Sequence, residues 1–172
     1  MTPSASSSRI ASQLGLAERI FAGPRARRLI DGVEAGLDRV DANLERELHV
    51  SDALADATSR YLFDAGGKRV RPMLALLTAH LGDGVTEDVV EAATALELTH
   101  LGSLYHDDVM DDADKRRGVP SAHSVWGNNI AILTGDLLFA RASQIMARLG
   151  EGAIRLQANT FERLVLGQMH ET

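Results

Sequence analysis

The segment 86–112 constrains the fold most, because its sequence favours one long helix that is enclosed on all sides. It contains no proline, Thr86 is a typical N-cap residue, and Glu87 and Asp88 place acids in the first turn, where the helix dipole favours them. Apolar residues occur on every side of the helix as far as Tyr105, so it is expected to lie at the centre of the protein. At about 1.5 Å per residue, the helix would be more than about 30 Å long.

The rest of the chain is also predicted to be helical. Apolar residues are 45% of the sequence but aromatic residues only 4%, a composition that favours helices over sheets. A helix that starts near Pro24 has apolar residues at steps of three or four, which form one buried stripe: Ile30, Val33, Leu37, Val40, Leu44 and Leu48. Further helices are expected over 51–64, capped by Ser51, and over 73–81, 128–149 and 151–171, with a polar loop over 114–124.

Domain organisation follows from the same pattern. The Ser-rich residues 1–8 have nothing to bury and are expected to be a disordered tail, so that structure starts near Arg9 and 9–172 form one unit. The formal net charge of −6 argues against a nucleic-acid partner. The chain has no cysteine, no leader-like apolar stretch and no apolar run long enough for a membrane span, so we expect a cytoplasmic protein.

Acidic residues crowd the C-terminal end of the central helix. Asp107 and Asp111 are four residues apart, so their carboxylates lie one turn apart on one face, while Asp108 is rotated by about 100°. Like charges at this spacing, at a helix C-terminus, destabilise a helix unless a cation binds them. Mg²⁺ prefers oxygen ligands and often uses one or two carboxylates together with substrate phosphates. The alternative interpretation is a solvated acidic helix end.

Basic residues gather in two places. The sequence GGKRVRP, from Gly66 to Pro72, puts three cations within four positions after a flexible turn, and Lys68 and Arg71 can hold a phosphate group. Arg116 and Arg117 follow the acidic cluster. An exposed basic loop is the simpler reading of either patch, but two cationic patches beside an acidic one fit two diphosphates, one held through Mg²⁺ and one held directly.

Three histidines accompany these charges. His100 lies two turns before Asp107 on the same helix face, whereas His106 adjoins the aspartates and His123 lies in the polar loop. Each has an ordinary reading as a hydrogen-bonded core, surface or capping histidine.

Taken together, GGKRVRP, ELTHLGSLYHDDVMDDADKRRGVPSAH and NNIAILTGDLLFARA resemble the trans-isoprenyl diphosphate synthases, and the resemblance extends from about Ile20 to the end. It implies an all-α, antiparallel helical bundle of the isoprenoid synthase type, of which this chain has the N-terminal half. In that family the DDxxD motif, here Asp107, Asp108 and Asp111, binds Mg²⁺ and the allylic diphosphate. The resemblance assigns Lys68, Arg71, His100 and Arg117 to isopentenyl diphosphate, Arg116 to the allylic diphosphate, and Gln168 to the lining of the site.

The resemblance also implies a reaction and a product length. Ionisation of an allylic diphosphate would give a cation that the double bond of isopentenyl diphosphate attacks, and loss of a proton would restore an allylic diphosphate five carbons longer. Family members that make short products have a bulky aromatic residue four or five positions before the motif. Here those positions are Ser103 and Gly102, so the growing chain can pass toward Thr99 and Leu96, and we expect products of about C25 or longer.

Two other classes remain open, namely a class I terpene cyclase and a non-catalytic subunit of a heteromeric prenyl synthase. GGKRVRP argues against the first and the intact aspartate motif against the second. The family's second aspartate-rich motif has no counterpart after Asp114, where Asp136, Glu151, Glu162 and Glu171 are isolated. We therefore expect a partner chain that supplies this motif, and an assembly that forms a dimer or higher oligomer.

Overall fold

The computed structural model describes residues 23–171, and it confirms the all-α fold class. The predicted tail over 1–8 lies outside the described residues. The helices are α2 (Pro24–Leu48), α3 (Ala53–Asp64), α4 (Val70–Ala79), α5 (Glu87–Met110), α6 (Ala122–Trp126), α7 (Asn128–Arg148) and α8 (Glu151–Glu171). The strands β1 (Lys115–Arg116) and β2 (Val119–Pro120) form a short antiparallel hairpin within the segment that the sequence predicted to be a polar loop.

Two helix starts differ from the prediction. The N-cap of α3 is Asp52 rather than Ser51, because the Asp52 side chain accepts a hydrogen bond from the backbone N–H of Ala55 at 2.9 Å. The next helix, α4, starts at Val70 and therefore includes the end of the basic turn, which was expected to precede the helix. By contrast, Thr86 caps α5 as predicted, accepting from the N–H of Val89.

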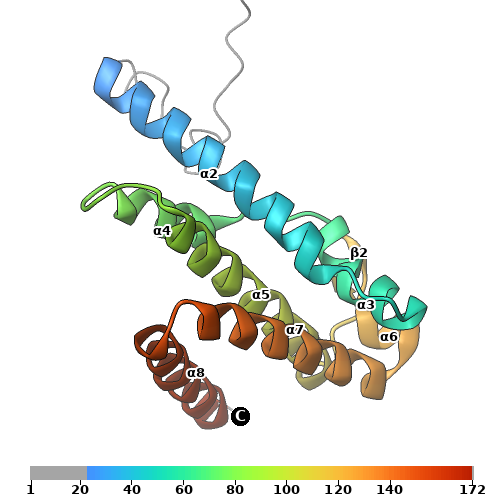
Figure 1. Ribbon diagram of the computed structural model, residues 1–172. Helices are drawn as coiled ribbons and strands as arrows, with labels where there is room; N and C mark the ends of the chain where they lie inside the picture. The colour runs from blue at the N-terminus through green and yellow to red at the C-terminus, as the bar shows by residue number, and fades with distance from the viewer. Residues whose placement is uncertain (1–22, 172) are drawn as a thin grey trace, which may run out of the picture.

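The central helix is α5, which packs against α2 and α4 on one side and α7 on the other (Figure 1). The predicted stripe of α2 is buried, with Val33, Leu37, Val40 and Leu44 fully enclosed. From α5, Leu98, Leu101 and Tyr105 fill the space between the helices, each with no exposed surface. The core therefore forms around α5, as expected, but the expectation of burial on all sides is only partly met: Leu96 is 42% exposed, and Thr99 and Ser103 on the same side are partly buried. The neighbours α2, α4 and α7 leave this side of the helix open.

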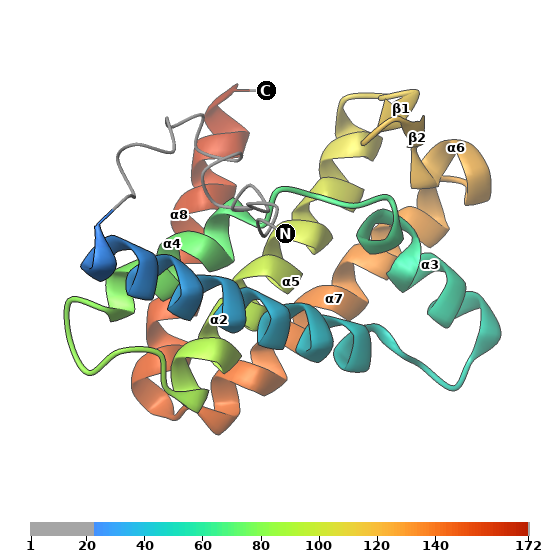
Figure 2. The ribbon, with the colours of Figure 1, turned by 90° about the horizontal axis from the view of Figure 1, so that it is seen from above.

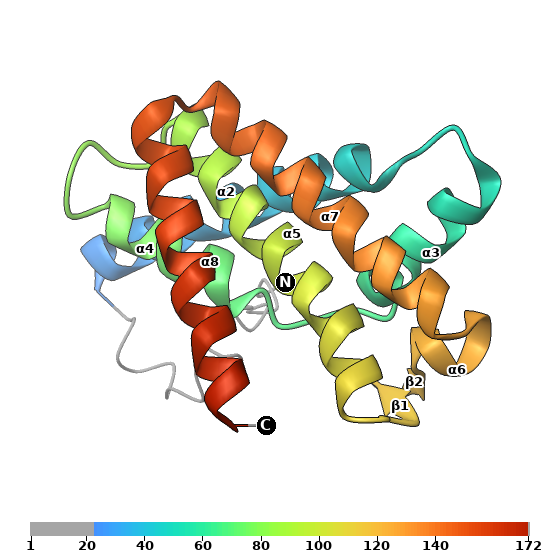
Figure 3. The same ribbon diagram turned by 90° about the horizontal axis from the view of Figure 1, so that it is seen from below.

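A pair of glycines lets α5 and α7 approach closely, with α7 running antiparallel to α5 (Figure 3). A Cβ added to Gly102 would lie 3.0 Å from the Gly135 carbonyl oxygen, and one added to Gly135 would meet the Gly102 carbonyl at the same distance. Any larger residue at either position would push the helices apart, so this crossing fixes where the C-terminal end of α5 emerges.

The elements that follow α5 gather at one end of the bundle. Figure 2 shows the hairpin, α6 and α3 together beside the end of α5. A hydrogen bond of 3.0 Å from the Tyr61 hydroxyl to the Pro120 carbonyl and an edge-on contact between Tyr61 and Trp126, 4.8 Å between ring centroids, hold this group together. The end of the bundle that contains the acidic motif is therefore a packed structure.

The helix α7 is the one described helix that is long and apolar enough to cross a membrane by length and composition. It packs against α3, α5, α6 and α8, and core helices pass the same test, so this property is weak evidence for a span. The last helix, α8, packs against α7 and has no buried residue.

Candidate active site

The acidic motif lies where α5 ends. Asp111 is the C-cap residue, its backbone N–H bonding to the Asp107 carbonyl at 2.8 Å, so the two residues are one helical turn apart as predicted. Burial raises the pKa of the Asp107 carboxyl, and the nearby charge of Asp111 raises it further. Two carboxylates therefore share one face at this end and repel each other.

The third aspartate has a different environment. Asp108 has no exposed surface, and its Oδ1 accepts from Arg116 Nη2 at 2.6 Å and from Arg116 Nε at 2.7 Å. Its second oxygen, Oδ2, is buried with no hydrogen-bond partner. A buried carboxylate oxygen without a partner is costly, so Asp108 retains the capacity to bind a cation or a donor that approaches this end of α5.

These carboxylates fit a hard divalent cation only in part. Within residues 23–171, no group of three or more acidic or histidine side chains lies close enough to hold a metal ion by itself. Asp107 and Asp111 are oxygen donors on one face, and Mg²⁺ commonly combines one or two carboxylates with substrate phosphates. The predicted ligand set of three aspartates is not assembled here, and the assignment of Asp108 as a ligand stays a prediction.

The hairpin carries Arg117 to the basic turn. Its Nη1 donates to the Leu62 carbonyl at 2.6 Å and also to the Gly66 carbonyl, and its guanidinium lies against Gly67. These carbonyls belong to the C-terminal end of α3 and to the turn after it, where backbone acceptors lack helical partners and favour a cation. Arg117 therefore joins the hairpin to GGKRVRP, segments that are about fifty residues apart in the sequence.

Within the basic turn, the three cations are not equivalent. Lys68 and Arg71 are exposed, whereas Arg69 is only 6% exposed. Lys68 and Arg71 are thus accessible to solvent, as expected of residues that bind an anion. The burial of Arg69, and of Glu97 beside it, was missed by the sequence reasoning, which treated the three cations as one patch.

His100 lies among the arginines of both patches. Burial, and after it the positive charges of Arg71, Arg117, Arg116 and Arg69, together lower its pKa from 6.5 to about 4. The imidazole is therefore neutral at pH 7 and available as a hydrogen-bond donor or acceptor. The contacts of Arg117 with the Gly66 carbonyl and of Arg116 with Asp108 bring GGKRVRP, the hairpin and α5 together.

The other two histidines have structural roles. The Nε2 of His106 lies 3.0 Å from the Ile132 carbonyl of α7, and its ring packs edge-on against Phe139 at 5.3 Å between centroids. His123 lies 2.8 Å from the Ala113 carbonyl and closes the loop after α5. The ordinary readings of both residues fit these contacts.

The predicted chain-length residues follow α5 toward the interior. Gly102 faces the crossing with α7, so its small size is required for packing as well as for any space beneath the motif. The Ser103 hydroxyl bonds to the His100 carbonyl at 2.9 Å. Thr99 lines a cavity of about 250 Å³ between α5, α7 and α8, together with Phe139, Ser143, Ile154, Gln157, Ala158 and Phe161.

Gln168 is on the exposed helix α8. The C-terminal ends of α8 and α5 lie on the same side of the molecule (Figures 2 and 3). The predicted role of Gln168 in lining the site stays a prediction.

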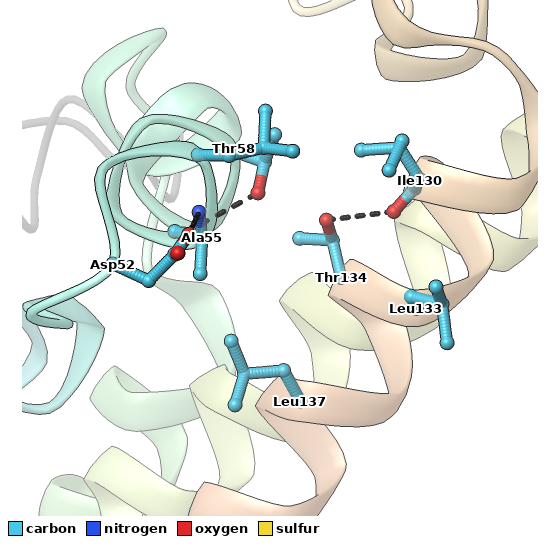
Figure 4. A pocket seen from close by; sticks show the side chains of 8 residues that line it. Asp52, Ala55, Thr58, Ile130, Leu133, Thr134 and Leu137 are labelled. Carbon is cyan, nitrogen blue, oxygen red and sulfur yellow. Dashed lines mark hydrogen bonds between the residues drawn. The ribbon is translucent and has the colours of Figure 1, made fainter.

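A second cavity, of about 130 Å³, lies between α3 and α7 (Figure 4). Its two threonines, Thr58 and Thr134, bond to the carbonyls of Ala55 and Ile130 in their own helices, and Leu133 and Leu137 make the wall apolar. None of the predicted site residues lines it, so this hollow is not the candidate site.

Comparisons with known proteins agree with the motifs. The family model described as polyprenyl synthetase matches residues 52–172. Nonaprenyl diphosphate synthase of Mycobacterium tuberculosis is 50% identical over 141 residues, which are 81% of this chain and 42% of that protein. Heptaprenyl diphosphate synthase component 2 of Geobacillus stearothermophilus is 41% identical, over 78% of this chain and 42% of that protein.

A solved structure gives the same result. The polyprenyl synthase of Caulobacter crescentus, crystallised with calcium and isoprenyl diphosphate, superposes with a TM-score of 0.78 at 32% identity, over 83% of this chain and 44% of that one. The chain thus spans less than half the length of each of these three relatives.

Proposed function

Because this chain belongs to the polyprenyl synthetase family, we propose that it carries the first half of the active site of a trans-polyprenyl diphosphate synthase. The enzyme condenses isopentenyl diphosphate with an allylic prenyl diphosphate. The observation that carries the proposal is the hairpin, which places Arg117 on the Gly66 carbonyl of the basic turn and Arg116 on Asp108 of the acidic motif. Two cationic segments joined beside an acidic motif, with a neutral His100 two turns before Asp107 on the same helix, suit a site for two diphosphates.

The chain's own residues would divide the work. Lys68, Arg71 and Arg117 hold the diphosphate of isopentenyl diphosphate, and His100 donates a hydrogen bond to it. Arg116, already beside the acidic motif through Asp108, holds the allylic diphosphate. The apolar walls of α5 and α7 keep water away from the allylic cation.

Asp107 and Asp111 would hold Mg²⁺, and Asp108 would join them when it exchanges Arg116 for the ion. Held there, Mg²⁺ would supply charge neutralisation at the leaving diphosphate. Calcium in the Caulobacter crescentus structure supports a divalent cation, and the oxygen donors of this site support Mg²⁺.

The product is proposed to have about C25 or more. Ser103 is small and partly buried, and the cavity that Thr99 lines continues the path away from the motif. The cavity of about 250 Å³ gives an apolar chain space between α5, α7 and α8.

A second polypeptide is proposed to supply the second aspartate-rich motif and to cover α8. Large apolar side chains are exposed along this helix: Ile154, Leu156, Phe161, Leu164, Val165, Leu166 and Met169. Exposed apolar side chains in this number on one helix are typical of an interface. The name of the Geobacillus stearothermophilus relative, a component 2, supports an enzyme of more than one chain. We also propose a dimeric or higher assembly and a cytoplasmic location, which the absence of cysteine supports.

The test is prenyl transfer from radiolabelled isopentenyl diphosphate to allylic primers, with and without Mg²⁺, by this chain alone and with a candidate partner. Lys68→Ala should raise KM for isopentenyl diphosphate more than KM for the primer. Arg60→Ala, which removes a partly exposed arginine that pairs with Asp64, is the matched control and should leave both unchanged. Cyclised products without use of isopentenyl diphosphate would indicate a terpene cyclase, and turnover by the partner alone would indicate a regulatory subunit.

A further inference from the structure

Arg69 is the buried member of the basic turn. It precedes α4 as the N-cap residue, with φ +50 and ψ +34 in the left-handed region. This backbone conformation is unfavourable for a non-glycine residue, so the surrounding structure must hold it there. The same residue that bends the chain into α4 is thus the one whose side chain is fixed in the interior.

The side chain of Arg69 contacts three helices. Its Nε donates to Asp41 Oδ1 of α2 at 2.8 Å, and its Nη1 donates to Glu97 Oε1 of α5 at 3.4 Å. Its guanidinium carbon lies 4.7 Å from the centre of the Phe63 ring of α3. Glu97 is itself only 2% exposed, so this ion pair is in the interior.

We infer that Arg69 is a positioning residue, which fixes the turn that carries Lys68 and Arg71 against α2, α3 and α5. The inference rests on the proposed function, because that function assigns a diphosphate ligand to the turn. Arg69 is too buried to contact a diphosphate, and its charge is already offset by Asp41 and Glu97. Its neighbours Lys68 and Arg71 are exposed, and their positions relative to His100 depend on where the backbone of Arg69 is held.

The energetics favour a positional role over a stabilising one. Replacing a buried ion pair with apolar residues of similar volume is often neutral or stabilising, whereas removing one partner is strongly destabilising because it leaves a buried charge unpaired. Removing both charges together, Arg69→Met with Glu97→Met, is therefore expected to keep the fold. Asp41, which would lose Arg69, is 25% exposed at its side chain and can be solvated.

The experiment measures inorganic pyrophosphate binding by calorimetry in EDTA, so that the metal-dependent site is silent. The double variant Arg69→Met/Glu97→Met leaves the net charge unchanged, so an account based on charge alone predicts unchanged affinity. Positioning predicts that affinity falls at least tenfold while the melting temperature stays near that of the wild type. The matched control is Arg148→Met/Glu91→Met, which removes an exposed ion pair of 2.8 Å between α7 and α5 and should bind as the wild type does.

Arg69→Lys provides a second test, because lysine keeps the positive charge but lacks the planar guanidinium group that can bind two carboxylates. It should also bind pyrophosphate more weakly. Hydrogen exchange provides a readout without ligand: the amides of residues 67–69 should exchange at least tenfold faster in the double variant, and those of α7 at the wild-type rate.

Equal affinity of the wild type and the double variant, within twofold, would overturn the inference, as would unchanged exchange in the turn. If the wild type itself failed to bind pyrophosphate, the proposed metal-free diphosphate site would be wrong. The exchange rates would then decide by themselves whether Arg69 anchors the turn.

Discussion

The Tyr105 hydroxyl joins α5 to α3, and its removal should cost measurable stability. It donates to the Thr58 carbonyl and accepts from the Leu62 N–H at 3.3 Å, and Tyr105 has no exposed surface. Thr58 and Leu62 are four residues apart in α3, so their carbonyl and N–H would ordinarily bond to each other. The hydroxyl of Tyr105, two residues before the acidic motif, thus contacts the carbonyl and the N–H of one turn of α3. Burial raises the pKa of this phenol, so it stays protonated and can donate at any pH at which the protein is studied.

The magnitude follows from the two hydrogen bonds. Each is worth about 1 kcal/mol net, which sets an upper figure of about 2 kcal/mol for Tyr105→Phe. The freed groups of α3 can bond to each other, so the expected loss is about 1–2 kcal/mol. For a domain of this size, about 1 kcal/mol shifts Tm by about 2–4 °C, and the expected shift is therefore about 2–8 °C.

The assay is urea unfolding and thermal melting followed by circular dichroism, with Tyr61→Phe as the matched control. Tyr61 makes one hydrogen bond, to the Pro120 carbonyl at 3.0 Å near the surface, so its loss should cost about 0.5 kcal/mol or less. If Tyr105→Phe unfolded at the same urea concentration as the wild type, or no earlier than Tyr61→Phe, the hydroxyl would have no energetic role.

Three further predictions concern the site. Asp111→Ala should abolish Mg²⁺-dependent prenyl transfer and, without metal, raise the unfolding free energy by about 0.3–1 kcal/mol, because it relieves repulsion with Asp107 and an unfavourable helix-end charge; turnover near the wild-type level would contradict the metal assignment. Ser103→Phe should shorten the product, read as chain length by chromatography, whereas an unchanged distribution would contradict the predicted path toward Thr99. His100 should titrate by NMR near pH 4 in the free protein, and pyrophosphate should raise its pKa by offsetting the arginines. Since the folded-state pKa lies below the ordinary value of 6.5, His100 should lower stability as pH falls from about 6.5 toward 4; a midpoint near 6.5 in the free protein would exclude this environment.

Local patterns in the sequence determined much of the fold. The start of α5 at Thr86, the buried stripe of α2 and the position of α8 depend on capping and on a period of 3.6 residues, which act within one or two turns. The i, i+4 relation of Asp107 and Asp111 is equally local, and it holds in the structure. Motif spacing also indicated the family correctly.

The tertiary structure decided what each charged residue contacts. Lys68 and Arg69 are adjacent cations in one turn, yet Arg69 is buried because Asp41 and Glu97, each 28 residues away, offer it carboxylates. Asp108 turns inward because the hairpin brings Arg116 to it, and Gly102 is required because Gly135 crosses it. These partners come from other segments of the chain, so the local sequence around each residue does not predict the contact. The motif therefore determined which residues belong to the site, whereas the packing of α2, α3, α5 and the hairpin decided which of them face a ligand and which hold the others in place.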